Sequence, residues 1–78
     1  MTKKHIEACV RESLEQYFRD LKGANPHSMH EMLVRTVERP LLEVVMKQAE
    51  GNQSKAADWL GLNRNTLRRK LVEHKLMK

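Results

Sequence analysis

The sequence predicts an all-α fold of four helices in a single small domain. Apolar residues recur at three- and four-residue steps, the spacing that places them on one face of an α-helix. Glycine, asparagine and proline residues interrupt this periodicity and divide it into four stretches. The length of 78 residues allows one domain and no more.

A domain of this size buries a modest share of its surface, so its stability as a lone monomer is marginal. Disulfides, a metal or a partner chain commonly supply the rest, and Cys9 is the only cysteine. No apolar run approaches the ~20 residues needed to cross a bilayer. The first five residues lead into a charged amphipathic stretch and not into the apolar core of a signal peptide. We therefore expect a cytoplasmic protein with no membrane contact.

The first helix is expected at about residues 4–22, where the apolar side chains form one stripe. Gly23 stands where a left-handed C-terminal cap belongs, and the Ala-Asn-Pro that follows continues the break. Ser28 and Glu31 have the spacing of a capping box, which predicts that a second helix begins near Met29. The stripe of the first helix consists of Ile6, Val10, Leu14, Tyr17, Phe18 and Leu21.

The second helix is apolar around nearly its whole circumference. A helix of this kind must be covered on several sides, and the remaining helices are few and short. The covering surface is therefore expected to include a second copy of the chain. Pro40 lies within the run and either kinks the helix or splits it; the apolar pattern resumes at once, which favours a kink. Lys47 and Gly51 mark the end of this helix.

Two short helices are expected after Gly51, at about residues 53–60 and 64–74. Asn52 and Asn63 are suited to cap their N-termini, and Gly61 stops the first of them. Such a pair has the requirements of a helix-turn-helix, in which small residues permit close crossing and the turn accepts a positive φ. Ala56 and Ala57 provide the close crossing, Leu60, Leu62, Leu67 and Leu71 hold the pair to the domain, and Trp59 is expected in the core.

The positive charge of the chain is confined to its last third. Residues 1–51 hold eight Lys or Arg and eight acidic residues, whereas residues 52–78 hold seven Lys or Arg and two acidic residues. The whole net charge of +5 therefore lies in the predicted helix-turn-helix and the residues after it. A local field of this kind suits a surface that binds a polyanion, although charge alone leaves open a solvated basic tail.

The last helix presents polar and basic side chains on the side opposite Leu67 and Leu71. At ~100° per residue, Asn65 and Arg69 point away from the core, with Thr66 and Arg68 on the two flanks. Asn63 and Arg64 occupy the N-terminus, the end from which recognition helices contact base edges. Arg can bridge guanine, Asn can pair with adenine, and Thr, Arg and Lys suit phosphates. The N-terminus of the preceding helix, at Asn52, Gln53, Ser54 and Lys55, suits a backbone phosphate.

At these residues the chain resembles the Fis family (factor for inversion stimulation). Residues 38–46 read Glu-Arg-Pro-Leu-Leu-Glu-Val-Val-Met, and residues 51–71 begin with the specific block Gly-Asn-Gln-Ser-Lys-Ala-Ala. The resemblance extends more weakly back to about Val10. It implies a four-helix homodimer of the bacterial nucleoid that binds and bends double-stranded DNA at degenerate sites and regulates transcription.

Carried over residue by residue, the resemblance implies base-edge contacts by Asn63 and Arg64. It also implies that the Pro40-kinked helix forms the dimer interface together with the first helix. The backbone contacts fall on Asn52, Ser54, Lys55, Thr66, Arg68, Arg69 and Lys70, with Asn65 on the same outward face. The interface residues are Leu33, Val37, Pro40, Leu41, Val44 and Val45. The best-studied family member has an N-terminal arm that contacts a DNA invertase. Few residues precede the first helix here, which argues against a recombinase contact but leaves DNA binding unaffected.

We therefore expect a two-helix dimerisation region at residues 1–50 and a helix-turn-helix DNA-binding region at residues 51–78, in one compact domain. Acidic and histidine side chains are scattered, without paired acid–base geometry or a closed ligand set. No enzyme activity, catalytic residue, metal or cofactor is expected.

Three alternatives stay open at this point. An RNA-binding protein is disfavoured by the lack of exposed aromatic residues and of a strand platform. A protein-interaction module would dock its second helix on a different partner. The same helix-turn-helix block also ends the larger activators of sigma-54 transcription, whose ATPase module is absent here.

Overall fold

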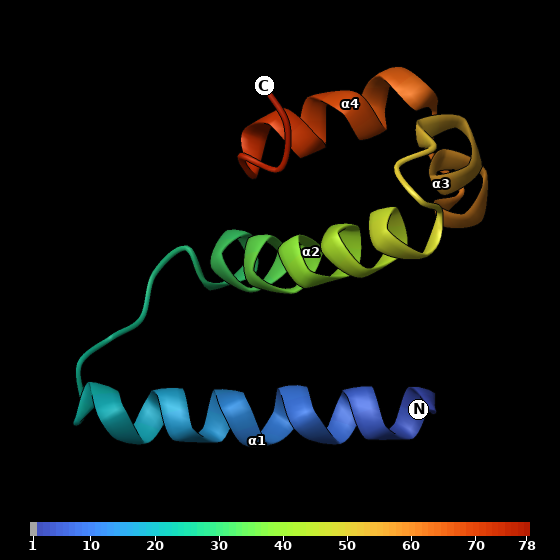
Figure 1. The fold of residues 1–78 in the computed structure, drawn as a ribbon. Helices are drawn as coiled ribbons and strands as arrows, with labels where there is room; N and C mark the ends of the chain where they lie inside the picture. Colours follow the sequence, from blue (N-terminus) through green and yellow to red (C-terminus); the bar gives the residue numbers. More distant parts are fainter. Residues whose placement is uncertain (1) are drawn as a thin grey trace.

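The computed structural model describes residues 2–78 and contains four α-helices; an extended linker at residues 22–28 joins the first two, and short turns join the others (Figure 1). No strand occurs in this part of the chain, so the predicted all-α class is confirmed. The predicted bounds of the first, third and fourth helices and the predicted start of the second agree with the structure to within one residue. The helices are α1 (Lys3–Leu21), α2 (Met29–Gln48), α3 (Gln53–Leu60) and α4 (Arg64–Glu73).

The buried core lies entirely in α2, α3, α4 and the turns between them. In Figure 1 these three helices form one group, and α1 is the outermost element. α3 packs against both α2 and α4, and the C-terminal Leu76 and Met77 fold back against the same core. α1 contributes no buried side chain. The buried apolar residues are Leu42, Ala49, Ala56, Ala57, Leu67 and Leu71.

The turn between α3 and α4 forms as the sequence predicts. The Asn52 side-chain oxygen accepts a hydrogen bond from the backbone N–H of Lys55 at 3.0 Å, which caps α3. The Asn63 side-chain oxygen likewise accepts from the N–H of Asn65 at 2.8 Å and caps α4. Gly61 ends α3 with φ +71°, a conformation that costs glycine little because it has no Cβ. These caps fix the mutual orientation of the two short helices.

Two predicted helix ends differ in detail from the structure. Ser28 has a left-handed backbone (φ 53°) and makes no side-chain capping bond, so the capping box predicted there is wrong. Its backbone does not have the extended conformation that an N-cap serine needs to reach the next turn. At the end of α1 the left-handed cap is Lys22 (φ 52°), one residue before the predicted Gly23, which is also left-handed.

Four residues other than glycine adopt positive φ in the described chain, and all of them lie at helix ends. Lys22 and Ser28 border the α1–α2 linker, Glu50 precedes Gly51 in the α2–α3 turn, and Lys75 follows α4. Their φ angles lie between 52° and 58°. A side chain in this region meets its own backbone, which makes the conformation unfavourable for residues with a Cβ.

α2 runs unbroken through Pro40, so the helix is not split there. A proline removes the N–H that would bond the carbonyl four residues earlier, which belongs to Thr36. The Thr36 hydroxyl in turn donates to the carbonyl of Met32 at 2.7 Å. On opposite sides of this helix, Leu42 is buried against α3 and α4, whereas Leu41 and Val44 remain about half exposed.

Candidate nucleic-acid interface

α4 separates an apolar inner side from a polar outer side. Leu67 and Leu71 are buried, while Asn65, Arg68 and Arg69 are exposed. The periodicity of the helix produces this separation, since residues four positions apart share one face. The structure thus places these three predicted contact residues on the accessible side of the helix, with Thr66 partly buried beside them.

The N-termini of α3 and α4 meet at a hydrogen bond between their side chains. The Arg64 guanidinium donates to the Ser54 hydroxyl oxygen at 3.1 Å, and both residues are exposed. A guanidinium has five N–H donors, so this bond leaves four that can reach a guanine or a phosphate. Asn52 and Asn63 use their side-chain oxygens as caps, and both residues are exposed at the helix ends. The arrangement concentrates hydrogen-bond donors at the ends of two helices.

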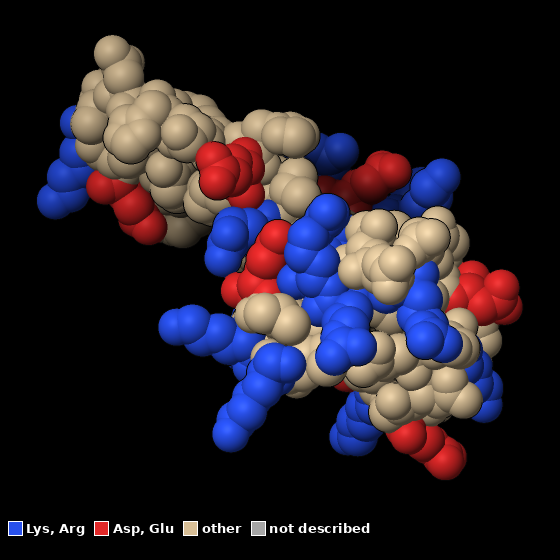
Figure 2. Space-filling view, turned by 90° about the horizontal axis from the view of Figure 1, so that it is seen from above, with Lys and Arg blue, Asp and Glu red and all other residues tan. Residues whose placement is uncertain are grey.

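Basic side chains gather on the surface formed by α3 and α4. Figure 2 views the molecule from above Figure 1, the side on which α4 lies, and shows many Lys and Arg side chains there. Arg69 lies 3.7 Å from Glu73, but both side chains are at least half exposed, so this ion pair constrains Arg69 little. This surface, which we call the basic face, comprises Lys55, Arg64, Arg68 and Arg69.

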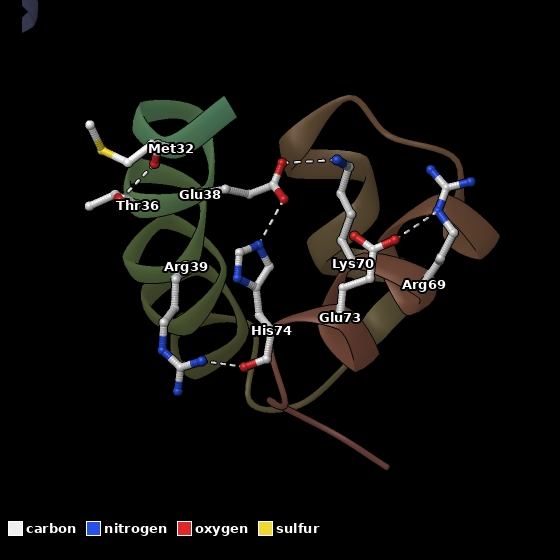
Figure 3. Close-up of polar contacts among 8 residues, drawn as sticks. All are labelled: Met32, Thr36, Glu38, Arg39, Arg69, Lys70, Glu73 and His74. Carbon is white, nitrogen blue, oxygen red and sulfur yellow. Dashed lines mark hydrogen bonds and ion pairs between the residues drawn. The ribbon is translucent and has the colours of Figure 1, made fainter. Parts of the chain in front are cut away.

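Lys70 lies apart from the basic face. Its ammonium donates to Glu38 Oε2 of α2 at 2.9 Å, and its side chain is only 25% exposed (Figure 3). His74 Nε2 lies 2.9 Å from the other oxygen of the same carboxylate, and the Arg39 guanidinium donates to the carbonyl of His74. The hydrogen bond from Lys70, followed by that from His74, holds the pKa of Glu38 below its usual value. Of the residues in this cluster, only Lys70 was among the predicted site residues.

Trp59 is 52% exposed, so its predicted place in the core is wrong. Ala56 and Ala57 fill the inner side of α3, which leaves the indole at the edge of the helix. The Lys55 ammonium, one helical turn earlier, lies 5.3 Å from the centre of the ring. An indole at this distance attracts a cation, so Trp59 borders the basic face and holds one of its members.

Most of the predicted dimer-interface residues lie on the side of α2 that faces away from the core. Leu33, Val37 and Leu41 line one shallow hollow together with Val34 and Glu38. Val44 is 59% exposed and Pro40 is exposed as well. Val45 differs, because it is partly buried and packs against the core cluster. We call the outer face of α2 the set of four exposed apolar residues Val34, Val37, Leu41 and Val44 together with the partly buried Leu33 beside them.

Two other kinds of site have no counterpart in residues 2–78. None of the helices is both long enough and apolar enough to cross a membrane. Within the same residues, no three His, Cys, Asp or Glu side chains come together as they would around a metal ion.

Residues 33–74 match the sequence model of the family described as "Bacterial regulatory protein, Fis family". The chain belongs to the Fis family. The matched segment includes most of α2, both capped helix starts and the whole of α4. It therefore contains the basic face, the outer face of α2 and the Glu38–Lys70–His74 cluster.

Relatives of this Fis-family chain match nearly its whole length. A "Putative Fis-like DNA-binding protein" of Ralstonia nicotianae is 54% identical over 77 residues, which cover 99% of this chain and 100% of the relative. A protein of the same description from Neisseria meningitidis serogroup A is 56% identical over 72 residues, or 92% of this chain and 91% of the relative. The "DNA-binding protein Fis" of Escherichia coli O1:K1 / APEC is 39% identical over 74 residues, or 95% of this chain and 76% of its own.

Proposed function

We propose that this chain is a homodimeric helix-turn-helix protein that binds and bends double-stranded DNA. In this proposal the two copies place their α4 helices in successive major grooves. The protein acts by binding, without catalysis, as a nucleoid-associated transcription regulator in the bacterial cytoplasm. The observation that carries the proposal is the exposure of Arg64, Arg68 and Arg69 on the outer side of α4 while Leu67 and Leu71 are buried.

DNA is favoured as the ligand because two kinds of contact group lie together. Arg64 stands at the N-terminus of α4, the end that reaches base edges in helix-turn-helix complexes. Arg68, Arg69 and Lys55 provide flanking cations that suit phosphates. The names of the relatives from Ralstonia and Escherichia describe DNA-binding proteins, which supports the same assignment.

The homodimer is favoured by the apolar surface that one chain leaves uncovered. The outer face of α2 includes four side chains that are 42% to 59% exposed, and on α1 Ile6 and Phe18 are about half exposed. A 78-residue chain that exposes this much apolar surface gains stability when a second copy covers it. We propose that α1 and the outer face of α2 form this interface, with Leu33, Val37, Pro40, Leu41, Val44 and Val45 in or beside it.

Electrophoretic shift assays with competing duplex DNA, duplex RNA and single strands test the DNA assignment. A dimer that engages roughly 6–10 phosphates should lose about 10³–10⁵ in affinity between about 50 and 200 mM salt. Arg64→Ala should cost about 1–3 kcal/mol and relax base preference at one position of each half-site. Arg69→Ala is the matched control, because a phosphate contact weakens all sequences alike. Unchanged affinity and preference in Arg64→Ala would show that Arg64 does not read DNA.

Sedimentation of the pure protein tests the dimer against the alternative of a protein-interaction module. A stable symmetric dimer leaves little of the outer face of α2 for a foreign partner. A monomer at micromolar concentration would instead leave that face open and favour the alternative.

A further inference from the structure

Four side chains join α2 to the C-terminal half of α4, and we call them the α2–α4 bridge. Glu38 holds the centre: one carboxylate oxygen accepts from the Lys70 ammonium and the other lies against His74 Nε2, both at 2.9 Å. Arg39 adds a hydrogen bond to the His74 carbonyl and an ion pair to Glu43 at 3.0 Å. His74 is 6% exposed, so the centre of the bridge is largely removed from water. Figure 3 shows Lys70 and His74 converging on the same carboxylate.

Lys70 is engaged in a way that its neighbours on α4 are not. The side chain of Arg69 is 66% exposed, against 25% for Lys70. To reach a phosphate, Lys70 would have to leave a carboxylate that is itself only 20% exposed. Removing one partner of such a pair leaves the other charge poorly solvated and unpaired, which is costly. A DNA phosphate therefore competes for Lys70 at a disadvantage, whereas Arg68 and Arg69 have no comparable cost.

The bridge also connects the two surfaces of the proposed function. Glu38 lies next to Val37, which belongs to the outer face of α2, and Lys70 lies next to Arg69 on the basic face. If two copies pair through α2, the separation and tilt of their α4 helices depend on how each α4 is held to its own α2. A carboxylate that bonds Lys70 through one oxygen and His74 through the other is suited to fix that angle, because its hydrogen bonds are directional.

We propose that Lys70 is a positioning residue which acts through Glu38 and His74 to set the angle of α4, and that it is not a phosphate contact. The inference rests on the proposed function, since it concerns how a DNA-bound dimer places its two α4 helices. It assigns Lys70 a different task from the backbone contact that the family resemblance implies.

The test compares Lys70→Met and Glu38→Gln with the matched control Arg68→Met, which removes an exposed cation two residues away. The DNA is the duplex that the wild-type protein selects from a random pool, together with versions that carry one or two extra base pairs between the half-sites. Affinity is measured for each duplex over a range of salt concentrations, and circular dichroism reports folding.

Lys70→Met and Glu38→Gln should behave alike, although one removes a positive charge and the other a negative one. Both should reduce the preference for the native spacing by roughly tenfold, which corresponds to about one charge-assisted hydrogen bond. Neither should change the salt dependence. Arg68→Met should keep the spacing preference but flatten the salt slope by about 1.8 per dimer, at about 0.9 for each phosphate lost. Lys70→Arg, which can still pair with Glu38, should restore the preference.

The inference would be overturned if Lys70→Met weakened DNA binding and Glu38→Gln strengthened it. If Lys70 contacts a phosphate, Lys70→Met flattens the salt slope as Arg68→Met does, and Glu38→Gln releases the ammonium and strengthens binding. Glu38→Gln keeps the size of its side chain and Lys70→Arg keeps the positive charge, so these two variants carry the comparison if Lys70→Met fails to fold. Failure of the wild-type protein to bind duplex DNA would overturn the proposed function itself, and this inference with it.

Discussion

α1 and the α3–α4 pair differ in where their apolar side chains lie. α1 has 19 residues and buries none of them, and its Ile6 and Phe18 are about half exposed. α3 and α4 together have 18 residues and bury four side chains completely or nearly so. The buried residues of the shorter pair are Ala56, Ala57, Leu67 and Leu71.

The difference shows that the two ends of this chain are stabilised in different ways. α3 and α4 are held by side chains of the same chain and by two asparagine caps. An isolated amphipathic helix of the length of α1 is only marginally stable in water, so α1 depends on the surface that covers its stripe. The helix-turn-helix is therefore packed within one chain, whereas the apolar stripe of α1 is left for the proposed dimer to cover.

The largest expected effect is the loss of a core side chain in α4. Leu67 is fully buried, so Leu67→Ala should reduce the free energy of unfolding by about 2–5 kcal/mol. Leu41→Ala removes the same side chain from the outer face of α2 and should cost a monomer much less. Urea unfolding of both variants measures the difference. If Leu67→Ala and Leu41→Ala lost the same free energy of unfolding at every protein concentration, the contrast between the buried core of α4 and the outer face of α2 would be wrong.

An intermediate effect is expected where the outer face of α2 acquires a charge. Val44 is 59% exposed in one chain, so Val44→Asp should leave the α2–α4 core folded but weaken the dimer. Burial of a valine contributes roughly 1.5–3 kcal/mol, and a dimer loses two of them. Sedimentation should then show the dimer dissociating at a higher protein concentration than in the wild type. Gln48→Asp, at an exposed position of the same helix, is the control, and a monomeric wild type would contradict the expected effect.

A smaller effect is expected from protonation of Glu38. Its pKa is lower in the folded chain than in the unfolded one, because the Lys70 and His74 side chains hydrogen-bond the carboxylate. The contribution to stability is therefore present at neutral pH and disappears as pH falls through and below the ordinary Glu range near about 4.3. Glu38→Gln should flatten this part of the stability–pH curve. An identical acid limb in the variant would show that Glu38 does not stabilise the bridge.

The smallest effect is expected at Trp59. A buried tryptophan would cost about 3–5 kcal/mol on truncation, whereas loss of an exposed cation–π contact costs about 0.5–1 kcal/mol. Trp59→Leu should fall in the lower range, because the indole is half exposed and its partner is Lys55. Chemical unfolding monitored by circular dichroism gives the value. Lys55→Gln should have a similar effect, and the two losses should not add.

Much of the fold was predictable because local signals agree along the chain. The apolar stripes indicate the lengths of the helices. Asn52, Gly61 and Asn63 cap or end helices through contacts with residues two to four positions away, so their roles follow from the sequence alone. Ser28 shows the limit of such rules. The spacing from Ser28 to Glu31 fits a capping box, but the left-handed backbone at Ser28 prevents the bond.

The outward-facing residues of α4 could be predicted from the sequence, but the contacts between α2 and α4 could not. Burial of Leu67 and Leu71 determines which side chains face outward, and helical periodicity gives that directly. Glu38 and His74 are 36 residues apart, and no local pattern pairs a glutamate with one histidine among four. The prediction that Trp59 lies in the core was wrong because only one side of α3 is buried, and Ala56 and Ala57 already occupy that side.

The four left-handed residues at the helix ends are positions at which substitution could increase the stability of this chain. Lys22, Ser28, Glu50 and Lys75 each hold a conformation that costs a residue with a Cβ about 1–2 kcal/mol relative to the right-handed one. Asparagine or glycine at these junctions would relieve that cost without altering the basic face, the α2–α4 bridge or the outer face of α2. Substitutions at the helix ends could thus raise the temperature of unfolding and leave the proposed binding surfaces unchanged.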